Sequence, residues 1–306
     1  RLYLINSGLV KGEEQRFTDS GVKEMVRRVL LPWFNSFKFL QTYAAIDNWK
    51  AENIEDFTFD NIVDQWIISK LQTLKANVAN EMAEYKLYNV VPALFEFIED
   101  LTNWYIRLNR SRFWSEGMTE DKEAAFKTLY LVLSELNISL APFAPFLSEH
   151  IYQELSVFTP TESERKQSVH LCSYPEAKES YIQPALEAAV ERMQSIILLG
   201  RQKRELVKIK TKIPLARLTI IHEDQSMLDE ISKLETYIKS ELNVKTLNYS
   251  TAEDEFINLY AKPNSPVLGK RFGKEFRTFK SLIENLNVKQ LKQLQDEGSL
   301  NLENEM

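Results

Sequence analysis

Apolar residues recur at every third or fourth position through most of the first half of the chain. Such stripes run through segments 19–31, 60–85, 89–114 and 119–140. This spacing places the apolar side chains along one face of an α-helix, and that face must be buried against another element. Because short segments connect the helices, the sequence predicts an antiparallel helix bundle.

The pattern changes in the second half. A polar stretch, 156–178, precedes a helix that begins at Pro184, and apolar segments 218–221, 244–249 and 256–261 are then typical of short β-strands. A single amphipathic helix is expected over 225–242. We therefore predict a mainly α chain in three parts. The predicted parts are a helical bundle at 1–156, a connector and junction helix at 157–216, and a small α/β domain at 217–306.

The net charge of −6 argues against a generic nucleic-acid binder, but the charges are unevenly distributed. Segment 201–217 holds seven basic residues and one acidic residue, and segment 262–280 holds six and one. A phosphate backbone responds to charges within about 8 Å at physiological salt, so local patches matter more than the total. The two segments are candidate phosphate contacts.

The sequence lacks the motifs of nucleotide-binding loops, cysteine zinc sites and membrane segments. The 8 glycines form neither of the spacings that cradle nucleotide phosphates, and the single cysteine, Cys172, excludes an internal disulfide or a cysteine zinc cluster. We predict no catalytic residues, no cofactor and no metal site in this chain. The absence of a long apolar run predicts no membrane segment, and we expect a cytosolic protein. The apolar start at Arg1 suggests a fragment of a longer chain.

Segment 103–114 carries the strongest functional signal. On a helix of about 100° per residue, the core side is expected to hold Trp104, Tyr105 and Leu108. The opposite side is expected to present Asn103, Arg107, Arg110 and Trp114. Guanidinium groups one turn apart suit phosphates, and an exposed indole can stack on an unpaired base. A solvated arginine face above a plain core explains the same pattern.

Each basic segment offers two further candidates. Arg201 and Arg204, at the end of the predicted junction helix, are placed to grip phosphate, and the alternating lysines of 208–212 suggest an edge strand. Lys270 and Arg271 stand between two glycines, where the backbone can approach an anion. A protected sheet edge and a plain surface loop are the alternatives.

Five co-linear motifs resemble the class I isoleucyl-tRNA synthetases of the eukaryotic cytosolic type. They are RLYLINS (1–7), LLPWFNSFKFL (30–40), DQWIISKL (64–71), LTNWYIRLNRSRFW (101–114) and LAPFAPFLSEHIY (140–152). Segments 214–222 and 267–271 are similar to the C-terminal junction region of that family. Valyl- and leucyl-tRNA synthetases share the bundle, and a helical scaffold for protein partners is an alternative from another class.

The resemblance implies a function. It makes 1–155 a class I anticodon-binding domain with tRNA(Ile) as its partner. The catalytic and editing domains of the parent enzyme, which uses ATP with Mg to make isoleucyl-tRNA, would lie upstream of Arg1. The expected tRNA contacts are Asn103, Arg107, Arg110, Trp114, Arg201, Arg204, Lys270 and Arg271.

Overall fold

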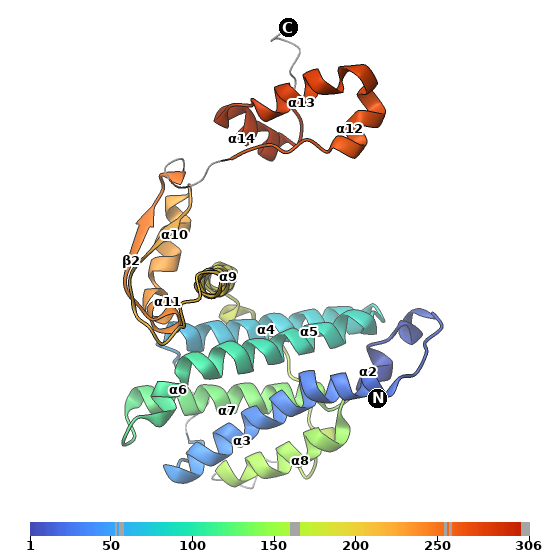
Figure 1. The fold of residues 1–306 in the computed structure, drawn as a ribbon. Helices are drawn as coiled ribbons and strands as arrows, with labels where there is room; N and C mark the ends of the chain where they lie inside the picture. Colours follow the sequence, from blue (N-terminus) through green and yellow to red (C-terminus); the bar gives the residue numbers. More distant parts are fainter. Residues whose placement is uncertain (53, 55–57, 160–165, 254–255, 257–258, 301–306) are drawn as a thin grey trace. The chain divides into compact units, whose positions relative to one another are not determined.

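The computed structural model describes residues 1–52, 54, 58–159, 166–253, 256 and 259–300 (Figure 1). The chain forms two compact units. The first comprises 1–214 and 231–244, and the second comprises 215–230 and 245–306. The connector and junction helix thus belong to the same unit as the bundle. The three-part domain division expected from the sequence stays a prediction.

The first unit is a bundle of helices with the apolar side chains inside. Its α-helices are α1 (Leu2–Ile5), α2 (Asp19–Met25), α3 (Leu31–Ile46), α4 (Ile62–Ala83), α5 (Leu87–Glu99), α6 (Arg107–Trp114), α7 (Glu120–Leu140), α8 (Pro145–Leu155), α9 (Pro184–Leu206) and α11 (Glu235–Leu242). Two π-helical segments are η2 (Val26–Leu30) and η3 (Asp100–Ile106). Short 3₁₀ turns are η1 (Gly8–Lys11), η4 (Ser156–Phe158), η5 (Val169–Leu171) and η6 (Glu179–Tyr181).

Local side chains define where these helices begin. The Asn61 side chain accepts a hydrogen bond of 2.8 Å from the backbone nitrogen of Val63 at the start of α4. Thr119 caps α7 by accepting one of 3.2 Å from the Lys122 nitrogen. Such caps satisfy backbone donors that a first helical turn leaves without partners. The helix start expected at Thr119 is confirmed.

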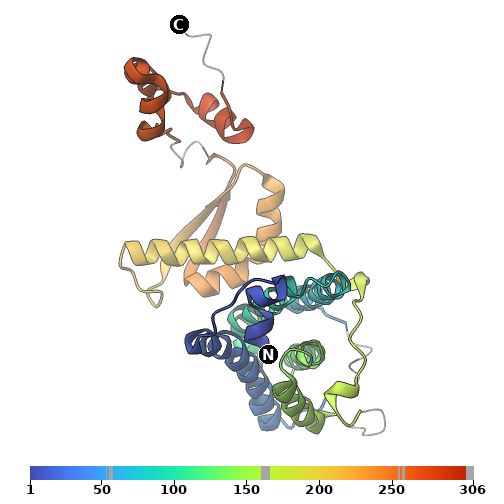
Figure 2. The ribbon, with the colours of Figure 1, turned by 90° about the vertical axis from the view of Figure 1, so that its right-hand side faces the viewer.

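Helix α9 crosses the bundle helices. Figure 1 shows α9 end-on while α4, α5 and α7 run across the view, and Figure 2 shows the reverse. Val190, Met193 and Ile197 form its buried stripe, and α9 packs against both α4 and α11. At Gly200 an added Cβ would lie 2.6 Å from the side chain of Leu242, so glycine permits the close approach of α9 to α11.

The helical run from α5 to α6 is continuous from Leu87 to Trp114, with η3 in its middle. A π-helix has a wider turn than an α-helix, so η3 rotates the faces of everything after it. Tyr105 is buried as expected, but Ile106, Asn109 and Phe113 are buried as well. Trp104 and Leu108, expected in the core, are only half-buried. The straight-helix assignment of these two residues was therefore wrong.

The second unit contains a two-stranded parallel sheet and helices. Its elements are β1 (Leu215–Ile221), α10 (Gln225–Ser232, whose last two residues belong to the other unit), β2 (Val244–Ser250, whose first residue belongs to the other unit), α12 (Ser265–Phe272), η8 (Gly273–Glu275), α13 (Phe276–Glu284) and α14 (Val288–Glu297). The first two predicted strands and the mainly α fold class are confirmed.

Two expectations for the second half were wrong. The single helix predicted over 225–242 is broken at 233–234 into α10 and α11. In the third predicted strand, Phe256 and residues 259–261 are not in a strand, and 257–258 lie outside the described residues. A short apolar run forms a strand only where a neighbouring strand can pair with it.

A buried polar network joins four elements of the bundle. Asp64 of α4 has no exposed surface, and the Arg112 guanidinium of α6 contacts its carboxylate oxygens at 2.8 Å and 2.9 Å. Tyr105 of η3 donates a 2.8 Å hydrogen bond to the same carboxylate, and Asp121 of α7 accepts from the Arg112 Nε atom at 2.9 Å. Burial, together with the charge of Asp64, raises the pKa of Tyr105, so its hydroxyl remains a donor.

We predict that Arg112→Met lowers the free energy of unfolding by about 3–5 kcal/mol, because Asp64 would be left buried without a charged partner. Urea unfolding followed by circular dichroism measures the change. Arg110→Met, on the same helix but exposed, should alter stability by no more than about 0.5 kcal/mol. Equal effects of the two replacements would show that the buried pair does not support the fold.

Candidate nucleic-acid interface

One face of the η3–α6 run carries the polar and aromatic side chains expected from the sequence. Asn103, Arg107, Arg110 and Trp114 are all exposed. Trp114 is 56% exposed, which is unusual for so large an apolar ring. Basic and aromatic groups thus share one helix face that is open to solvent.

Arg110 makes no ion pair or hydrogen bond with another side chain among the described residues. Its guanidinium is exposed and lies one turn from both Arg107 and Trp114. An unpaired guanidinium can offer its whole fork of donors to a phosphate. Arg110 is therefore the candidate with the fewest competing contacts inside the protein.

Trp114 has an aromatic neighbour that sequence reasoning missed. The ring of Tyr43, from α3, lies 6.5 Å from the Trp114 ring at an interplanar angle of 47°. Phe39, one turn before Tyr43, contacts both Tyr43 at 4.8 Å and the buried Phe113 at 5.0 Å. The i, i+4 spacing of Phe39 and Tyr43 signals a shared helix face, but only the fold brings that face to Trp114.

Arg107 and Arg201 meet at a single carboxylate. Glu241 of α11 accepts from the Arg107 Nε atom at 3.2 Å and from its Nη2 atom at 3.0 Å. Arg201, on α9, donates to the same Glu241 through its own Nη2 atom. The predicted residues Arg107 and Arg201, distant in sequence, are thus neighbours in the structure.

Arg204 has a different environment. It is 4% exposed, and its guanidinium donates to the backbone oxygens of Leu242 at 2.8 Å and Ile213 at 2.7 Å. These carbonyls lie at the end of α11 and in the turns after α9, so Arg204 ties the chain together there. A buried guanidinium with these partners cannot reach a phosphate, and we remove Arg204 from the candidate interface.

The lysines after α9 do not form the expected edge strand. Residues 208–213 are a series of turns, in which Lys208 has a φ of 55° and the Ile213 nitrogen donates to the Lys210 oxygen at 3.0 Å. The Asn243 side chain donates to the Thr211 oxygen at 3.0 Å and holds the turn in place. The lysine alternation was misleading because the backbone nitrogens of Lys208 and Ile209 donate to Glu205 and Arg204 of α9 and do not pair with a neighbouring strand.

Lys270 and Arg271 lie in the second unit. Both are exposed on the last turn of α12, and the Arg271 guanidinium lies 5.6 Å from the Phe272 ring. Gly269 is inside the helix, so the glycine-flanked loop expected there was wrong. Of the two glycines, only Gly273, just after the helix, has a positive φ, of 50°.

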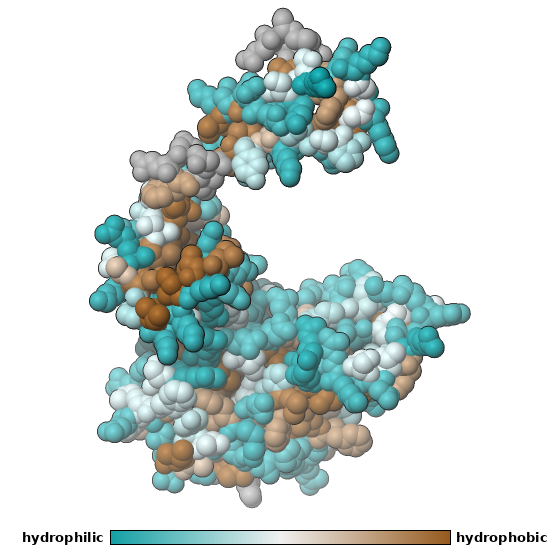
Figure 3. Space-filling model, in the orientation of Figure 1, coloured by the Kyte–Doolittle hydropathy of each residue, from teal (hydrophilic) through white to brown (hydrophobic). Residues whose placement is uncertain are grey.

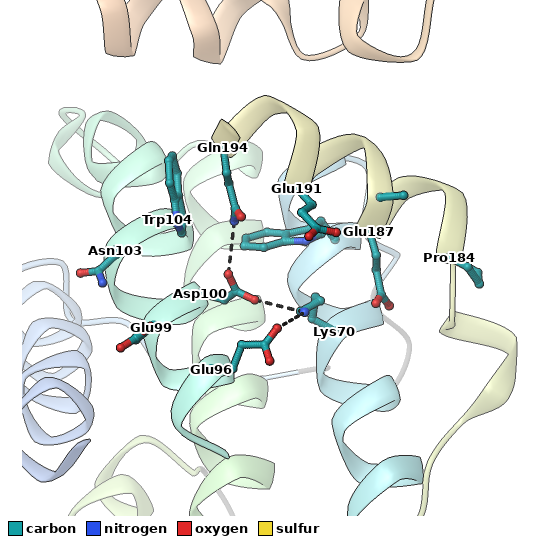
Figure 4. A pocket seen from close by; sticks show the side chains of 12 residues that line it. Lys70, Glu96, Glu99, Asp100, Asn103, Trp104, Pro184, Glu187, Glu191 and Gln194 are labelled. Carbon is teal, nitrogen blue, oxygen red and sulfur yellow. Dashed lines mark hydrogen bonds and ion pairs between the residues drawn. The ribbon is translucent and has the colours of Figure 1, made fainter. Parts of the chain in front are cut away.

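An acidic pocket of about 470 Å³ borders the arginine face (Figure 4). Lys70 lies inside it, 3.3 Å from Asp100 and 3.5 Å from Glu96, and Gln194 donates to Asp100 at 3.2 Å. Its lining includes the carboxylates Glu96, Glu99, Asp100, Glu187 and Glu191. Burial raises the pKa of Asp100 above its ordinary value, although Lys70 opposes that change. Asn103, one of the exposed residues of the arginine face, is among the residues that line this pocket.

The rest of the described surface has scattered apolar patches but no cluster of metal ligands and no membrane-spanning helix. Hydrophilic side chains cover most of the bundle face seen in Figure 3, with apolar side chains gathered in scattered patches. In the part of the chain that the structure describes, no three histidine, cysteine, aspartate or glutamate side chains gather as metal ligands would. None of the described helices combines the length and apolar character that crossing a lipid bilayer requires.

The helical bundle presents arginine and tryptophan side chains together on one exposed face. The model of the family described as "Anticodon-binding domain of tRNA ligase" matches residues 64–220, about half of the chain. The chain therefore belongs to this family of anticodon-binding domains.

Within that family the chain is similar to isoleucine–tRNA ligases. It is 43% identical to the enzyme of Bdellovibrio bacteriovorus over 305 residues, which is 100% of this chain and 28% of that protein. The cytoplasmic enzyme of Saccharomyces cerevisiae is 42% identical, with 98% of this chain and 29% of that protein covered. The cytoplasmic enzyme of Mus musculus is 39% identical, with 99% and 25% covered.

The chain spans little more than a quarter of the length of these relatives. The resemblance to the anticodon-binding region of isoleucyl-tRNA synthetases is confirmed. Bacterial and eukaryotic relatives are about equally similar, so the comparison does not separate the eukaryotic type from the bacterial one.

We predict that Trp114→Phe causes the largest decrease in acrylamide quenching of the intrinsic fluorescence among single tryptophan replacements. Trp114 is 56% exposed, whereas Trp33 and Trp66 are 0% and 1% exposed. Trp104→Phe, which removes a half-buried indole of η3, should lower quenching less. Unchanged quenching in Trp114→Phe would mean that this ring is covered in solution.

Proposed function

We propose that the chain binds tRNA(Ile) and recognises its anticodon for an isoleucine–tRNA ligase. The observation that carries the proposal is the exposed face of α6, where the unpaired Arg110 and the open ring of Trp114 lie within the matched range 64–220. The similarity of the whole chain to isoleucine–tRNA ligases supports tRNA(Ile) as the partner.

The two kinds of side chain divide the work of RNA binding. Arg107 and Arg110 neutralise backbone phosphates, and this contribution weakens as salt rises because it depends on counterion release. Trp114, with Tyr43 beside it, offers ring faces to the unpaired bases of an anticodon loop. Lys270 and Arg271 of the second unit supply further phosphate contacts, and the amide of Asn103 donates at the edge of the same face.

The complete enzyme contributes the chemistry. In this proposal, catalytic and editing domains elsewhere in the same chain use ATP with Mg to join L-isoleucine to the tRNA bound here. The residues of the arginine face hold the tRNA and contribute no reacting group. The yeast and mouse relatives are described as cytoplasmic enzymes, which supports action in the cytoplasm.

Replacing both Arg107 and Arg110 with alanine should weaken tRNA(Ile) binding and reduce the slope of log affinity against log salt by about one for each phosphate that is no longer neutralised. Gel shifts at several salt concentrations measure the slope. The double variant Arg27→Ala/Arg28→Ala removes two exposed arginines from η2 and controls for the same change in net charge. An unchanged slope in the variant of Arg107 and Arg110 would show that these two arginines do not touch phosphate.

The same gel shifts should include a length-matched anionic polymer. We expect the wild-type chain to bind tRNA(Ile) more tightly than the polymer at equal charge. Equal binding to both, or binding to neither, would instead indicate a helical scaffold for protein partners and would contradict the proposed function.

Trp114→Ala should weaken binding of an isolated tRNA(Ile) anticodon stem–loop by about 1–3 kcal/mol, the usual contribution of one stacked base. Tyr43→Ala should weaken it in the same direction, and both effects should persist at high salt because stacking does not depend on counterions. Fluorescence anisotropy with a labelled stem–loop measures both. An effect that disappears when the loop is replaced by a duplex of equal length supports stacking on unpaired bases; an effect retained on the duplex contradicts it.

A further inference from the structure

Glu241 is an acidic side chain that contacts two arginines of the candidate interface. Its side chain is 11% exposed, and its two oxygens accept from Arg107 of α6 and Arg201 of α9. The side chains of Arg107 and Arg201 remain 45% and 28% exposed. Both guanidinium groups therefore bind the carboxylate on one side and face solvent on another.

Two guanidinium groups that converge on one anion form an arrangement that a phosphate also satisfies. Glu241 accepts from the Arg107 and Arg201 nitrogens that face it and neutralises one of the two positive charges. Any polyanion that approaches Arg107 and Arg201 meets donors already engaged and a carboxylate that repels it. Arg110, which has no such partner among the described residues, presents its full charge.

We propose that Glu241 is a specificity-determining residue, an internal anion that competes with phosphate for Arg107 and Arg201. The competition weakens binding of every polyanion through the arginine pair. An RNA that also engages Arg110 and stacks on Trp114 tolerates this weakening, whereas an RNA held by charge alone does not. The inference rests on the proposed function. It assigns the selectivity for tRNA(Ile) to a residue of α11, which lies outside the basic segments 201–217 and 262–280.

The chain provides a matched control on the same helix. Glu235, at the start of α11 and six residues before Glu241, forms an ion pair of 3.2 Å with Lys239. Glu235→Gln and Glu241→Gln change the net charge by the same amount on the same helix. A difference between the two variants therefore reports the position of the carboxylate and not the total charge.

The experiment compares the full chain with E241Q and E235Q. The dissociation constants are measured for tRNA(Ile), for a tRNA with a different anticodon and for heparin, each at several salt concentrations. E241Q should bind heparin and the second tRNA about threefold to tenfold more tightly, with a salt slope steeper by about one. Its affinity for tRNA(Ile) should rise less, so the selectivity ratio falls, while E235Q keeps the wild-type ratio.

A variant that lacks all three groups, R107Q/R201Q/E241Q, should not gain affinity for heparin, because the gain requires the released arginines. If E241Q melts at a lower temperature than the wild type, the heparin measurement is repeated with E241D, which keeps the carboxylate. Its carboxylate is withdrawn by one methylene, so a smaller gain in heparin affinity is expected. Equal behaviour of E241Q and E235Q would overturn the proposal, as would a gain in the triple variant or a loss of tRNA(Ile) affinity with no gain for heparin.

The heparin affinities test the effect of Glu241 on polyanion binding without using tRNA. If wild type fails to prefer tRNA(Ile) over heparin, the proposed function fails, and the selectivity assigned to Glu241 fails with it. If wild type prefers tRNA(Ile) but E241Q behaves like E235Q, only the role of Glu241 is overturned. The two failures are therefore distinguishable.

Discussion

The buried ion pair between Asp64 and Arg112 is the interaction that orders the helices of the first unit around the candidate interface. It joins α4 to α6, and through Tyr105 and Asp121 it also holds η3 and α7. A carboxylate with no exposed surface is tolerable only with charged and hydrogen-bonded partners, so the packing of the four elements must keep these partners together. That requirement orients α6, and the orientation of α6 decides which of its side chains face solvent.

The π-helical segment η3 changes which side chains of α6 face solvent. Its wider turn moves Ile106, Asn109 and Phe113 into the core and leaves Arg107, Arg110 and Trp114 outside. Phe113 contacts Phe39, and Phe39 contacts Tyr43, so core packing also brings a second ring to the side of Trp114. The proposed stacking surface therefore depends on the packing beneath it.

The phosphate-binding capacity of each arginine at this surface depends more on its neighbouring side chains than on the net charge of the chain. The chain has a net charge of −6, and an acidic pocket lies directly beside the arginine face. Arg110 is unpaired among the described residues, and Arg107 and Arg201 share one carboxylate. Arg204 donates its hydrogen bonds to backbone carbonyls. Four arginines that look alike in the sequence thus have three different capacities for binding phosphate.

The amino-acid sequence alone was enough to predict the helical bundle, the capped start at Thr119, the first two strands and the exposed face of Arg107, Arg110 and Trp114, because periodicity and capping act over a few neighbouring residues. The three-dimensional fold was needed for the break at 233–234, the shift at η3, the burial of Arg204 and the meeting of Glu241 with two arginines. The burial of Arg204 and the contacts of Glu241 depend on partners more than 30 residues away in sequence, and the shift at η3 depends on a wider helical turn, so none of the three leaves a local pattern.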